Sequence, residues 1–235
     1  MTKSTVAQIR NRFDNDVDRF SNLETGQTAV MDTLLLLDVV TGAAAQINPQ
    51  ASHVLDVGCG GGNFTMRLLQ KLPNLNVTLV DLSAPMLERA KSRVAKVTSG
   101  QVDTQQSDIR ELTLPTAQFD VILAGSVLHH LRTDTEWQAV FDKFHAALKP
   151  GGSVWVSDLI EHDLPQIQAL MWARYGDYLV DFQDEAYRDK VYSYIEQEDT
   201  PKSVLYQIDR IRQAGFSQVE ILHKNSCFAA FGGVK

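Results

Sequence analysis

With 235 residues, 44% of them hydrophobic and 22% charged, the chain has the composition of an ordinary soluble globular protein, long enough for one α/β domain. Its formal net charge of −7, with no run of basic residues, argues against a nucleic-acid or acidic-membrane surface, because Lys and Arg drive phosphate binding. The two cysteines match no metal or redox spacing, and we find neither an apolar leader nor a membrane-spanning stretch, so we expect a cytoplasmic protein without a metal site.

Two helical patterns precede the first predicted strand. Apolar residues recur every three to four positions from Ile9 to Phe20 and again from Met31 to Val39, with a break at Ser21-Asn22 and Gly26. Two interpretations are open: both helices pack on the flank of a sheet, or the first closes over a bound cofactor as a lid. The candidate lid residues are Arg12, Phe13, Arg19 and Phe20.

Residues 53–64 join a strand, a glycine turn and a helix. Residues 54–57 are apolar with one acid, which is typical of a strand buried on both faces of a parallel sheet. Four glycines follow within residues 58–62, where positive φ costs little and backbone N–H groups can approach a ligand. Asn63 is the expected N-cap of the next helix. This arrangement is typical of nucleotide-like cofactor sites in α/β proteins.

The glycine spacing separates two kinds of cofactor. Asn63 occupies the third position of the dinucleotide fingerprint G-x-G-x-x-G, which counts against NAD. The glycines follow G-x-G-x-G instead, behind Asp56, and an acid there suits an ammonium group better than a pyrophosphate. This D-x-G-x-G-x-G sequence resembles the first motif of the class I S-adenosylmethionine (SAM) methyltransferases. The resemblance implies SAM as cofactor and S-adenosylhomocysteine (SAH) as product.

The next two strands end in acids that extend the resemblance. Residues 77–81 are predicted as a buried strand ending in Asp81, whose carboxylate would accept hydrogen bonds from both ribose hydroxyls. Ser83 and Pro85 begin the following helix, and Met86 would lie beside the adenine. A third strand at residues 102–106 leads to Asp108, which by resemblance would accept from the adenine amine. The full set of expected cofactor-binding residues is Asp56, Gly58, Cys59, Gly60, Gly62, Asp81, Leu82, Met86, Ser107, Asp108, Ile109, Ala124, Gly125 and Ser126.

The segment after the fourth predicted strand, residues 119–123, is expected to line the reaction pocket, because ligands bind outside the carboxyl ends of parallel strands. His129 and His130 are candidate catalytic residues that would contact the acceptor and take its proton. We favour His129, which is nearer the strand end. Alternatively, one ring packs against the methionine part of the cofactor and the other is an ordinary hydrogen-bonded histidine.

The second half of the chain contains one irregular part. A capping box at Thr133 and Glu136 predicts a helix, and the Leu-Lys-Pro-Gly-Gly turn before the fifth strand, residues 153–158, again resembles the methyltransferases. Residues 163–200 are rich in aromatic side chains and are predicted to form a helical insertion. The candidate acceptor contacts are Asp158, Trp172, Tyr175 and Tyr178, and the alternative for the aromatics is packing of the insertion onto the core.

The chain end completes the predicted fold. Thr200 and Pro201 are expected to start a helix that stops at Gly215, and residues 218–223 and 227–231 are expected to form a hairpin. We predict an α/β fold: a doubly wound, mostly parallel seven-stranded sheet with a C-terminal antiparallel hairpin, the class I methyltransferase fold. A single domain would cover 1–235, divided into N-terminal helices (1–50), a SAM-binding core (51–160), a helical cap insertion (161–200), and the last helix and hairpin (201–235).

The predicted function is methyl transfer from SAM to a small-molecule acceptor, achieved mainly by positioning because SAM is already activated. The nature of the methylated atom stays open. One alternative is a tRNA-modifying SAM-dependent transferase, since the layout and Ala214-Gly215-Phe216 resemble the bacterial tRNA carboxymethyluridine synthase family. Others are a non-catalytic SAM- or nucleotide-binding regulator and an NAD-dependent enzyme. The acidic charge favours a small molecule over RNA.

Overall fold

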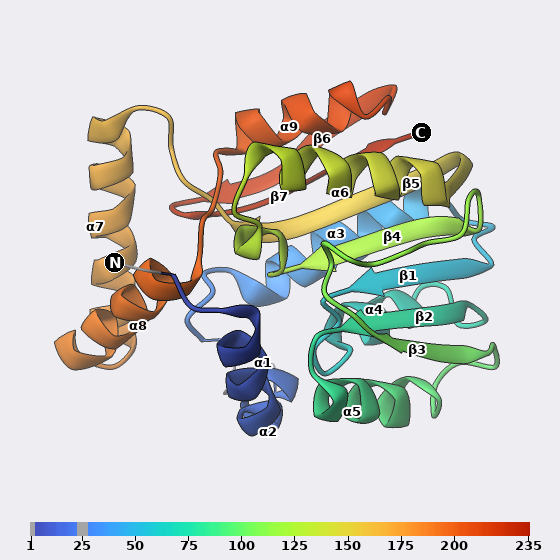
Figure 1. The fold of residues 1–235 in the computed structure, drawn as a ribbon, viewed down its shortest axis with the longest axis horizontal. Helices are drawn as coiled ribbons and strands as arrows, with labels where there is room; N and C mark the ends of the chain where they lie inside the picture. The colour runs from blue at the N-terminus through green and yellow to red at the C-terminus, as the bar shows by residue number, and fades with distance from the viewer. Residues whose placement is uncertain (1–2, 23–27) are drawn as a thin grey trace.

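The computed structural model describes residues 3–22 and 28–235, and a seven-stranded sheet forms its centre (Figure 1). The strands are β1 (His53–Val57), β2 (Asn76–Asp81), β3 (Val102–Gln106), β4 (Phe119–Gly125), β5 (Leu148–Leu159), β6 (Gln218–Asn225) and β7 (Phe228–Val234). Their order is β3-β2-β1-β4-β5-β7-β6. The first five strands pair in parallel, and β7 is antiparallel to both β5 and β6. The predicted fold class is confirmed.

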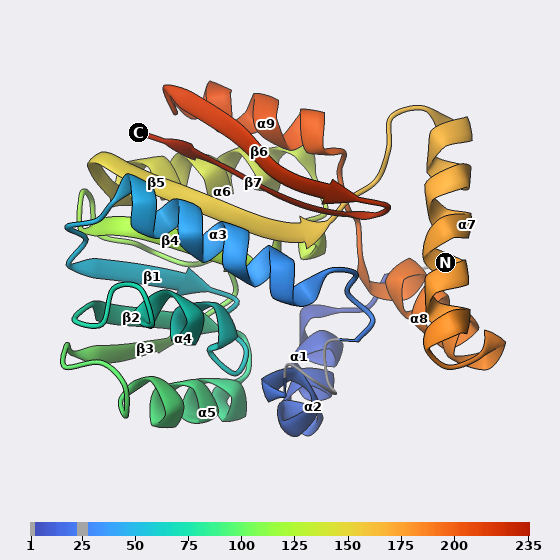
Figure 2. The ribbon, with the colours of Figure 1, turned by 180° about the vertical axis from the view of Figure 1, so that it is seen from behind.

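Helices cover both faces of the sheet (Figures 1 and 2). One face carries α3 (Thr33–Ile47), α4 (Asn63–Leu69) and α5 (Ala84–Val94), and the other carries α6 (Asp134–Ala147) and α9 (Val204–Gln213). Alternate residues of β4 enter the two cores, with Leu123 on the α3 face and Ile122 on the α6 face. Because both faces are buried, the central strands β1 and β4 are mostly apolar, each with one acid.

Of the four predicted helix N-caps, two are present in the structure and two are not. The Ser83 cap of α5 and the Thr133–Glu136 capping box of α6 are both present. The predicted Asn63 cap is wrong, because Gly62 occupies the N-cap position in the left-handed region, at φ 81°. The Thr200 cap is also wrong: α9 begins at Val204, with Ser203 as its cap. Thr200 lies outside any helix or strand, and its hydroxyl accepts a hydrogen bond from Arg132 at 2.7 Å.

Four helices lie beyond the carboxyl ends of the strands (Figure 1). The first predicted helix is divided into α1 (Val6–Asn15) and α2 (Val17–Ser21), and the predicted break at Gly26 lies outside the described residues. The insertion is helical as predicted, with α7 (Pro165–Phe182) and α8 (Glu185–Glu198). The terminal hairpin is longer than predicted and turns at residues 226–227, where Ser226 has positive φ. Within residues 3–22 and 28–235, no helix combines the length and apolarity needed to cross a membrane.

Asp120 connects β4 to β1 and β5 by hydrogen bonds at the end of the sheet opposite the carboxyl ends of the parallel strands. Its carboxylate accepts hydrogen bonds from the backbone N–H groups of Ser52 and His53, both at 2.9 Å, and from Lys149 at 2.8 Å. Burial acts to raise the pKa of Asp120, but these donors hold the pKa below its ordinary value.

We therefore predict a pH-dependent loss of stability for Asp120→Asn. At pH 7 the variant should lose about 1–2 kcal/mol of unfolding free energy, because a neutral amide replaces the shared carboxylate. A depressed folded-state pKa stabilises the fold fully above the unfolded-state value of about 4, and this contribution disappears as the pH falls through the folded-state pKa. Urea unfolding of both proteins across that range should show the difference shrinking in acid. Equal stability at pH 7 would contradict the assignment.

Candidate active site

The glycine loop between β1 and α4 is held in place by the end of β2. The N–H groups of Gly58 and Cys59 both donate to the carbonyl of Val80, at 2.8 and 3.0 Å. Gly58 and Gly60 have positive φ, and a Cβ atom at Gly58 would lie 2.6 Å from the side chain of Val127. Only glycine combines positive φ with the absence of a Cβ atom at residue 58. The loop can therefore lie directly against Val127, in the segment that follows β4.

A cavity lies between this loop and the N-terminal helices. It brings together most of the residues that the sequence predicted for the cofactor. They are Gly58, Cys59, Gly60, Asp81, Leu82, Met86, Ser107, Asp108, Ile109, Gly125 and Ser126. They come from the carboxyl ends of β1, β2, β3 and β4, as expected for an open parallel sheet.

Three predicted cofactor residues lie outside the cavity wall. Asp56 is 1% exposed beneath the loop, where its carboxylate accepts the hydroxyl of Thr65 at 2.6 Å. Burial raises the pKa of Asp56 to about 6. Gly62 starts α4 with its backbone against Ala90, and Ala124 is buried in the core beneath α6. The expectation that Asp56 meets an ammonium group is therefore corrected, because its carboxylate is directed into the α4 side of the core.

Asp81 is the acid best placed for ribose. One carboxylate oxygen accepts the N–H of Gly60 at 2.8 Å and the other accepts the N–H of Ser83 at 2.9 Å. Its side chain lines the cavity and is largely buried, and burial raises its pKa. Each carboxylate oxygen has further acceptor capacity, so Asp81 can hold the loop and accept ligand hydroxyls together.

Asp108 is paired with a residue that the sequence analysis missed. Arg110 donates to its two oxygens from Nε at 2.8 Å and from Nη2 at 2.5 Å. Burial acts to raise the pKa of Asp108, but the Arg110 hydrogen bonds bring the pKa below its ordinary value. Both residues line the cavity, so Asp108 is a fixed, ionised acceptor. The sequence signal that could have predicted this ion pair is the two-residue spacing between Asp108 and Arg110 in one loop.

Helices α1 and α2 form an apolar roof over the cavity. Val6, Ile9, Phe13 and Phe20 line it, and the two phenylalanine rings meet edge to face with centroids 5.2 Å apart. Of the four lid candidates, Phe13 and Phe20 face the cavity. Arg19 pairs with Asp16 on the surface. This arrangement favours the lid interpretation over simple packing on the sheet.

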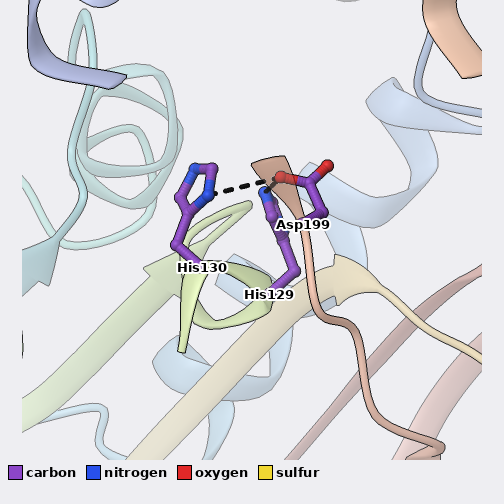
Figure 3. A group of neighbouring side chains, drawn as sticks. All are labelled: His129, His130 and Asp199. Atoms are coloured by element: carbon purple, nitrogen blue, oxygen red, sulfur yellow. Dashed lines mark ion pairs between the residues drawn. The ribbon is translucent and has the colours of Figure 1, made fainter. Parts of the chain in front are cut away.

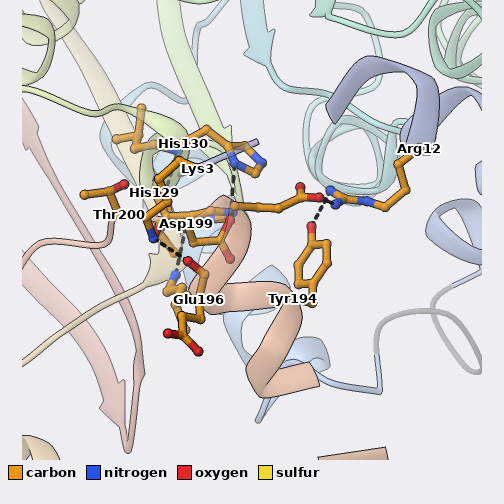
Figure 4. Close-up of polar contacts among 12 residues, drawn as sticks. Lys3, Arg12, His129, His130, Tyr194, Glu196, Asp199 and Thr200 are labelled. Carbon is orange, nitrogen blue, oxygen red and sulfur yellow. Dashed lines mark hydrogen bonds and ion pairs between the residues drawn. The ribbon is translucent and has the colours of Figure 1, made fainter. Parts of the chain in front are cut away.

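The roof is fastened to the end of α8 (Figure 4). Arg12 donates to the hydroxyl of Tyr194 at 2.5 Å and forms an ion pair with Glu198. Lys3 donates to the carbonyl oxygens of Glu196, at 2.7 Å, and of Asp199. The insertion therefore holds the cover of the cavity through its last turn.

Asp158 positions the first histidine. Its carboxylate accepts the backbone N–H of Leu128 at 2.8 Å and of His129 at 3.2 Å, and it is hydrogen-bonded to Nδ1 of the His129 ring. Asp158 is 1% exposed and lies outside the cavity wall. The expected contact between Asp158 and an acceptor is corrected, because this carboxylate holds the short helix η1 (Leu128–His130).

The two histidines differ in environment. Burial acts to lower the pKa of His129, but the carboxylates of Asp158 and Asp199 raise the pKa to about 9. Burial and the neighbouring His129 together lower the pKa of His130. His130 lines the cavity and His129 does not. The structure thus favours His130, where the sequence favoured His129.

Asp199 completes this group and was missed by the sequence analysis. Its Oδ1 lies 3.3 Å from Nδ1 of His130 and 3.7 Å from Nε2 of His129 (Figure 3). Burial acts to raise the pKa of Asp199, but the two imidazoles hold the pKa below its ordinary value. Asp199 directly follows α8, and only the folded chain brings it to the end of β4.

The aromatic residues of the insertion pack instead of lining the cavity. Tyr175 is 1% exposed, and its hydroxyl donates to the carbonyl of Ala29 at 2.8 Å. The hydroxyl of Tyr178 donates to Thr28 at 2.7 Å, and Trp172 stacks on Tyr192. The expectation that Trp172, Tyr175 and Tyr178 contact an acceptor gives way to the packing alternative.

Known proteins resemble this chain in both sequence and fold. Residues 54–152, from β1 into β5, match the family described as methyltransferase domain. The fold is similar to that of magnesium protoporphyrin IX methyltransferase from Synechocystis, solved with bound SAH. The TM-score is 0.65 at 17% identity, over 98% of this chain and 99% of that one.

Residues 54–152 belong to the methyltransferase domain family, and the fold of the chain is that of the class I SAM-dependent methyltransferases. The predicted family and its cofactor, SAM, are confirmed. An uncharacterized methyltransferase of Mycobacterium tuberculosis is 34% identical over 119 residues, which is 51% of this chain and 55% of that relative. The chain thus spans about half the length of such relatives. A carboxy-S-adenosyl-L-methionine synthase of Shewanella amazonensis is 28% identical over 188 residues, 78% of this chain and 76% of that protein.

The roof over the cavity supports a prediction about Arg12. We expect Arg12→Ala to weaken SAM binding roughly tenfold, because the charge-assisted contacts that hold α1 over the cavity are lost. Arg10→Ala is the matched control, since Arg10 is exposed on the same helix. Calorimetric titration of both variants with SAM tests the prediction. Unchanged affinity in Arg12→Ala would show that α1 does not contribute to cofactor retention.

Proposed function

We propose that the protein transfers the methyl group of SAM to a small-molecule acceptor, with the cofactor bound in the cavity over the glycine loop. The observation that carries this proposal is the convergence of three features on one cavity: the glycine loop, the buried Asp81, and the paired Asp108. Together they match a ligand with a ribose, an adenine and a compact charged tail.

Within this proposal each feature has one task. Asp81 would accept the ribose hydroxyls while keeping Gly60 in place, and Asp108 would accept from the adenine amine. Gly125 and Ser126 would border the methionine part, with the methyl group toward His130. The remaining predicted cofactor residues, the single-domain division and a cytoplasmic location stay predictions.

The chemistry asks little of the protein beyond alignment. SAM supplies an activated methyl group, so an acceptor held in line with it reacts without extensive assistance. The apolar roof would exclude water, and His130 stands where an acceptor would approach. A small acceptor fits the net charge of −7 and the covered cavity better than a polynucleotide does.

A transfer experiment tests this proposal. The protein is incubated with methyl-labelled SAM and a cell extract that is then separated into small molecules, RNA and protein. We expect label in the small-molecule fraction, together with release of SAH. Label in the RNA fraction would favour the tRNA-modifying alternative, and binding of SAM without any transfer would favour the regulator.

A second candidate function is synthesis of carboxy-SAM. The observation in its favour is the relative from Shewanella amazonensis, which bears that name and aligns over three quarters of both chains. Mass analysis of the nucleoside that co-purifies with the protein separates the candidates. SAM or SAH supports methyl transfer, whereas carboxy-SAM would support the second function.

A further inference from the structure

We propose that His129, His130 and Asp199 form a binding site for one divalent transition-metal ion of the zinc type, beside the cofactor cavity. Both imidazole rings turn toward one carboxylate oxygen of Asp199 (Figure 3). The three side chains each offer one ligand atom, and all three atoms lie within 4.8 Å of one another. The sequence predicted no metal site, because the donors come from two segments far apart in the chain.

The spacing of the donor atoms fits a tetrahedral site. Zinc binds nitrogen and oxygen at about 2.0–2.2 Å, so neighbouring ligand atoms lie about 3.3–3.5 Å apart. The observed separations from Oδ1 of Asp199 are 3.3 Å to His130 and 3.7 Å to His129. The two ring nitrogens lie within 4.8 Å of each other, so a bound ion would draw the rings toward each other as well as toward Asp199.

Two of the polar atoms at this site are incompletely satisfied. Among the described residues, Oδ1 of Asp199 and Nδ1 of His130 are both buried, and neither makes a well-aligned hydrogen bond; their contact with each other, at 3.3 Å, is an ion pair. Asp199 is 3% exposed. Buried polar atoms without partners are rare and costly, and an ion at this position would satisfy both.

Asp158 orients the His129 ring as a metal ligand requires. Metal binding would displace the proton from Nε2 of His129, and the hydrogen bond between Nδ1 and the Asp158 carboxylate would hold the remaining ring proton on Nδ1. Nε2 is the nitrogen that faces Asp199. Metal-binding histidines usually donate their other ring N–H to a carboxylate in this way.

The carboxylates beside the two histidines supply negative charge for a divalent cation. Two buried carboxylates, Asp158 and Asp199, face two imidazoles. None of the adjacent cationic side chains among the described residues is hydrogen-bonded to the Asp199 carboxylate, although Lys3 donates to the main-chain carbonyl of Asp199. Within the described chain, Lys3 donates to main-chain carbonyls, Arg12 pairs with Glu198 and Tyr194, and Arg132 donates to Thr200.

The donor set also selects the class of metal. Two imidazole nitrogens and one carboxylate oxygen suit Zn²⁺, Co²⁺, Ni²⁺ or Fe²⁺, whereas Mg²⁺ and Ca²⁺ prefer oxygen ligands alone. Three protein ligands leave a position for an exogenous ligand, as in catalytic zinc sites. Because His130 also lines the cofactor cavity, that ligand would be a group at the acceptor end of the cavity.

Metal titration of the chelator-treated, tag-free chain tests the proposal without reference to methyl transfer. We expect one Zn²⁺ or one Co²⁺ per chain, visible absorption bands from bound Co²⁺, and no comparable binding of Mg²⁺. Asp199→Asn and His130→Asn should each lower Zn²⁺ affinity at least tenfold. His223→Asn is the control, because it removes a histidine that pairs with Asp32 near the surface, and it should bind like the wild type.

The wild-type titration decides the question even if a variant fails to fold. Absence of stoichiometric Zn²⁺ and Co²⁺ binding by the wild type would overturn the proposal and leave His129, His130 and Asp199 as an ion-pair cluster. Wild-type affinity in folded Asp199→Asn and His130→Asn, or loss of binding in His223→Asn, would place the metal elsewhere and overturn it as well. Circular dichroism establishes which variants are folded.

Discussion

Replacing Asp81 with alanine should weaken SAM binding by about 30- to 150-fold, which corresponds to about 2–3 kcal/mol. The carboxylate is the proposed acceptor for both ribose hydroxyls, and charge-assisted hydrogen bonds of this kind are among the stronger ones. It also holds the N–H of Gly60 at 2.8 Å, so its loss releases the glycine loop at the same time. Both effects act on the cofactor site and add in the same direction.

Calorimetry with SAM on the folded variant measures this loss. Asp103→Ala is the matched control, because Asp103 is an exposed carboxylate on the neighbouring strand β3, bonded to the Gln101 amide. We expect wild-type affinity for that control. Unchanged affinity in Asp81→Ala would mean that the ribose is held by another residue.

Tyr175→Ala should lower the free energy of unfolding by about 3–5 kcal/mol, the usual cost of removing a large buried ring. The ring is 1% exposed and packs against Trp172, Tyr192 and Phe228, at centroid distances of 5.3–6.1 Å. These contacts join α7 to α8 and to the start of β7. The residue therefore acts on stability and not on the acceptor.

Two comparisons sharpen this prediction. Tyr175→Phe keeps the ring and loses the hydrogen bond to Ala29, so it should cost only about 1 kcal/mol. At a temperature where Tyr175→Ala remains folded, its SAM affinity should equal that of the wild type. If urea unfolding shows no loss of stability while methyl transfer is abolished, the earlier idea of an acceptor contact would be restored.

The cofactor loop could be predicted because its signal is local. The positive φ angles at Gly58, Gly60 and Gly62 correspond to residues that the sequence displays side by side. Asp81 ends one predicted parallel strand and Asp108 follows the next, and parallel strands bring their carboxyl ends to one edge. Chain order therefore placed Asp81 at the cavity, and the resemblance to the methyltransferases added Asp108.

Side-chain direction was harder to predict than position. Asp56 is at the predicted strand end, but the alternation of the strand turns it toward Thr65. The same limit applies to the His129–His130 pair, where the sequence favoured the wrong ring as the one nearest the cavity. Spacing in a motif does not reveal which of two adjacent side chains faces a ligand.

Long-range contacts account for what the sequence missed. Asp199 reaches the histidines only because the insertion returns its last turn to the end of β4. The aromatic residues of α7 looked like a substrate surface because their burial against residues 28–29 is invisible in the sequence. Local patterns record a helix and its composition, but not the surface on which it packs.

Calorimetric titration of the wild-type chain with SAH and with NAD tests the central claim most directly. The cavity geometry predicts that one SAH binds per chain and raises the melting temperature by mass action, while NAD produces neither heat nor stabilisation. An absence of SAH binding, or tighter binding of NAD, would contradict the assignment of this cavity to the methyl donor.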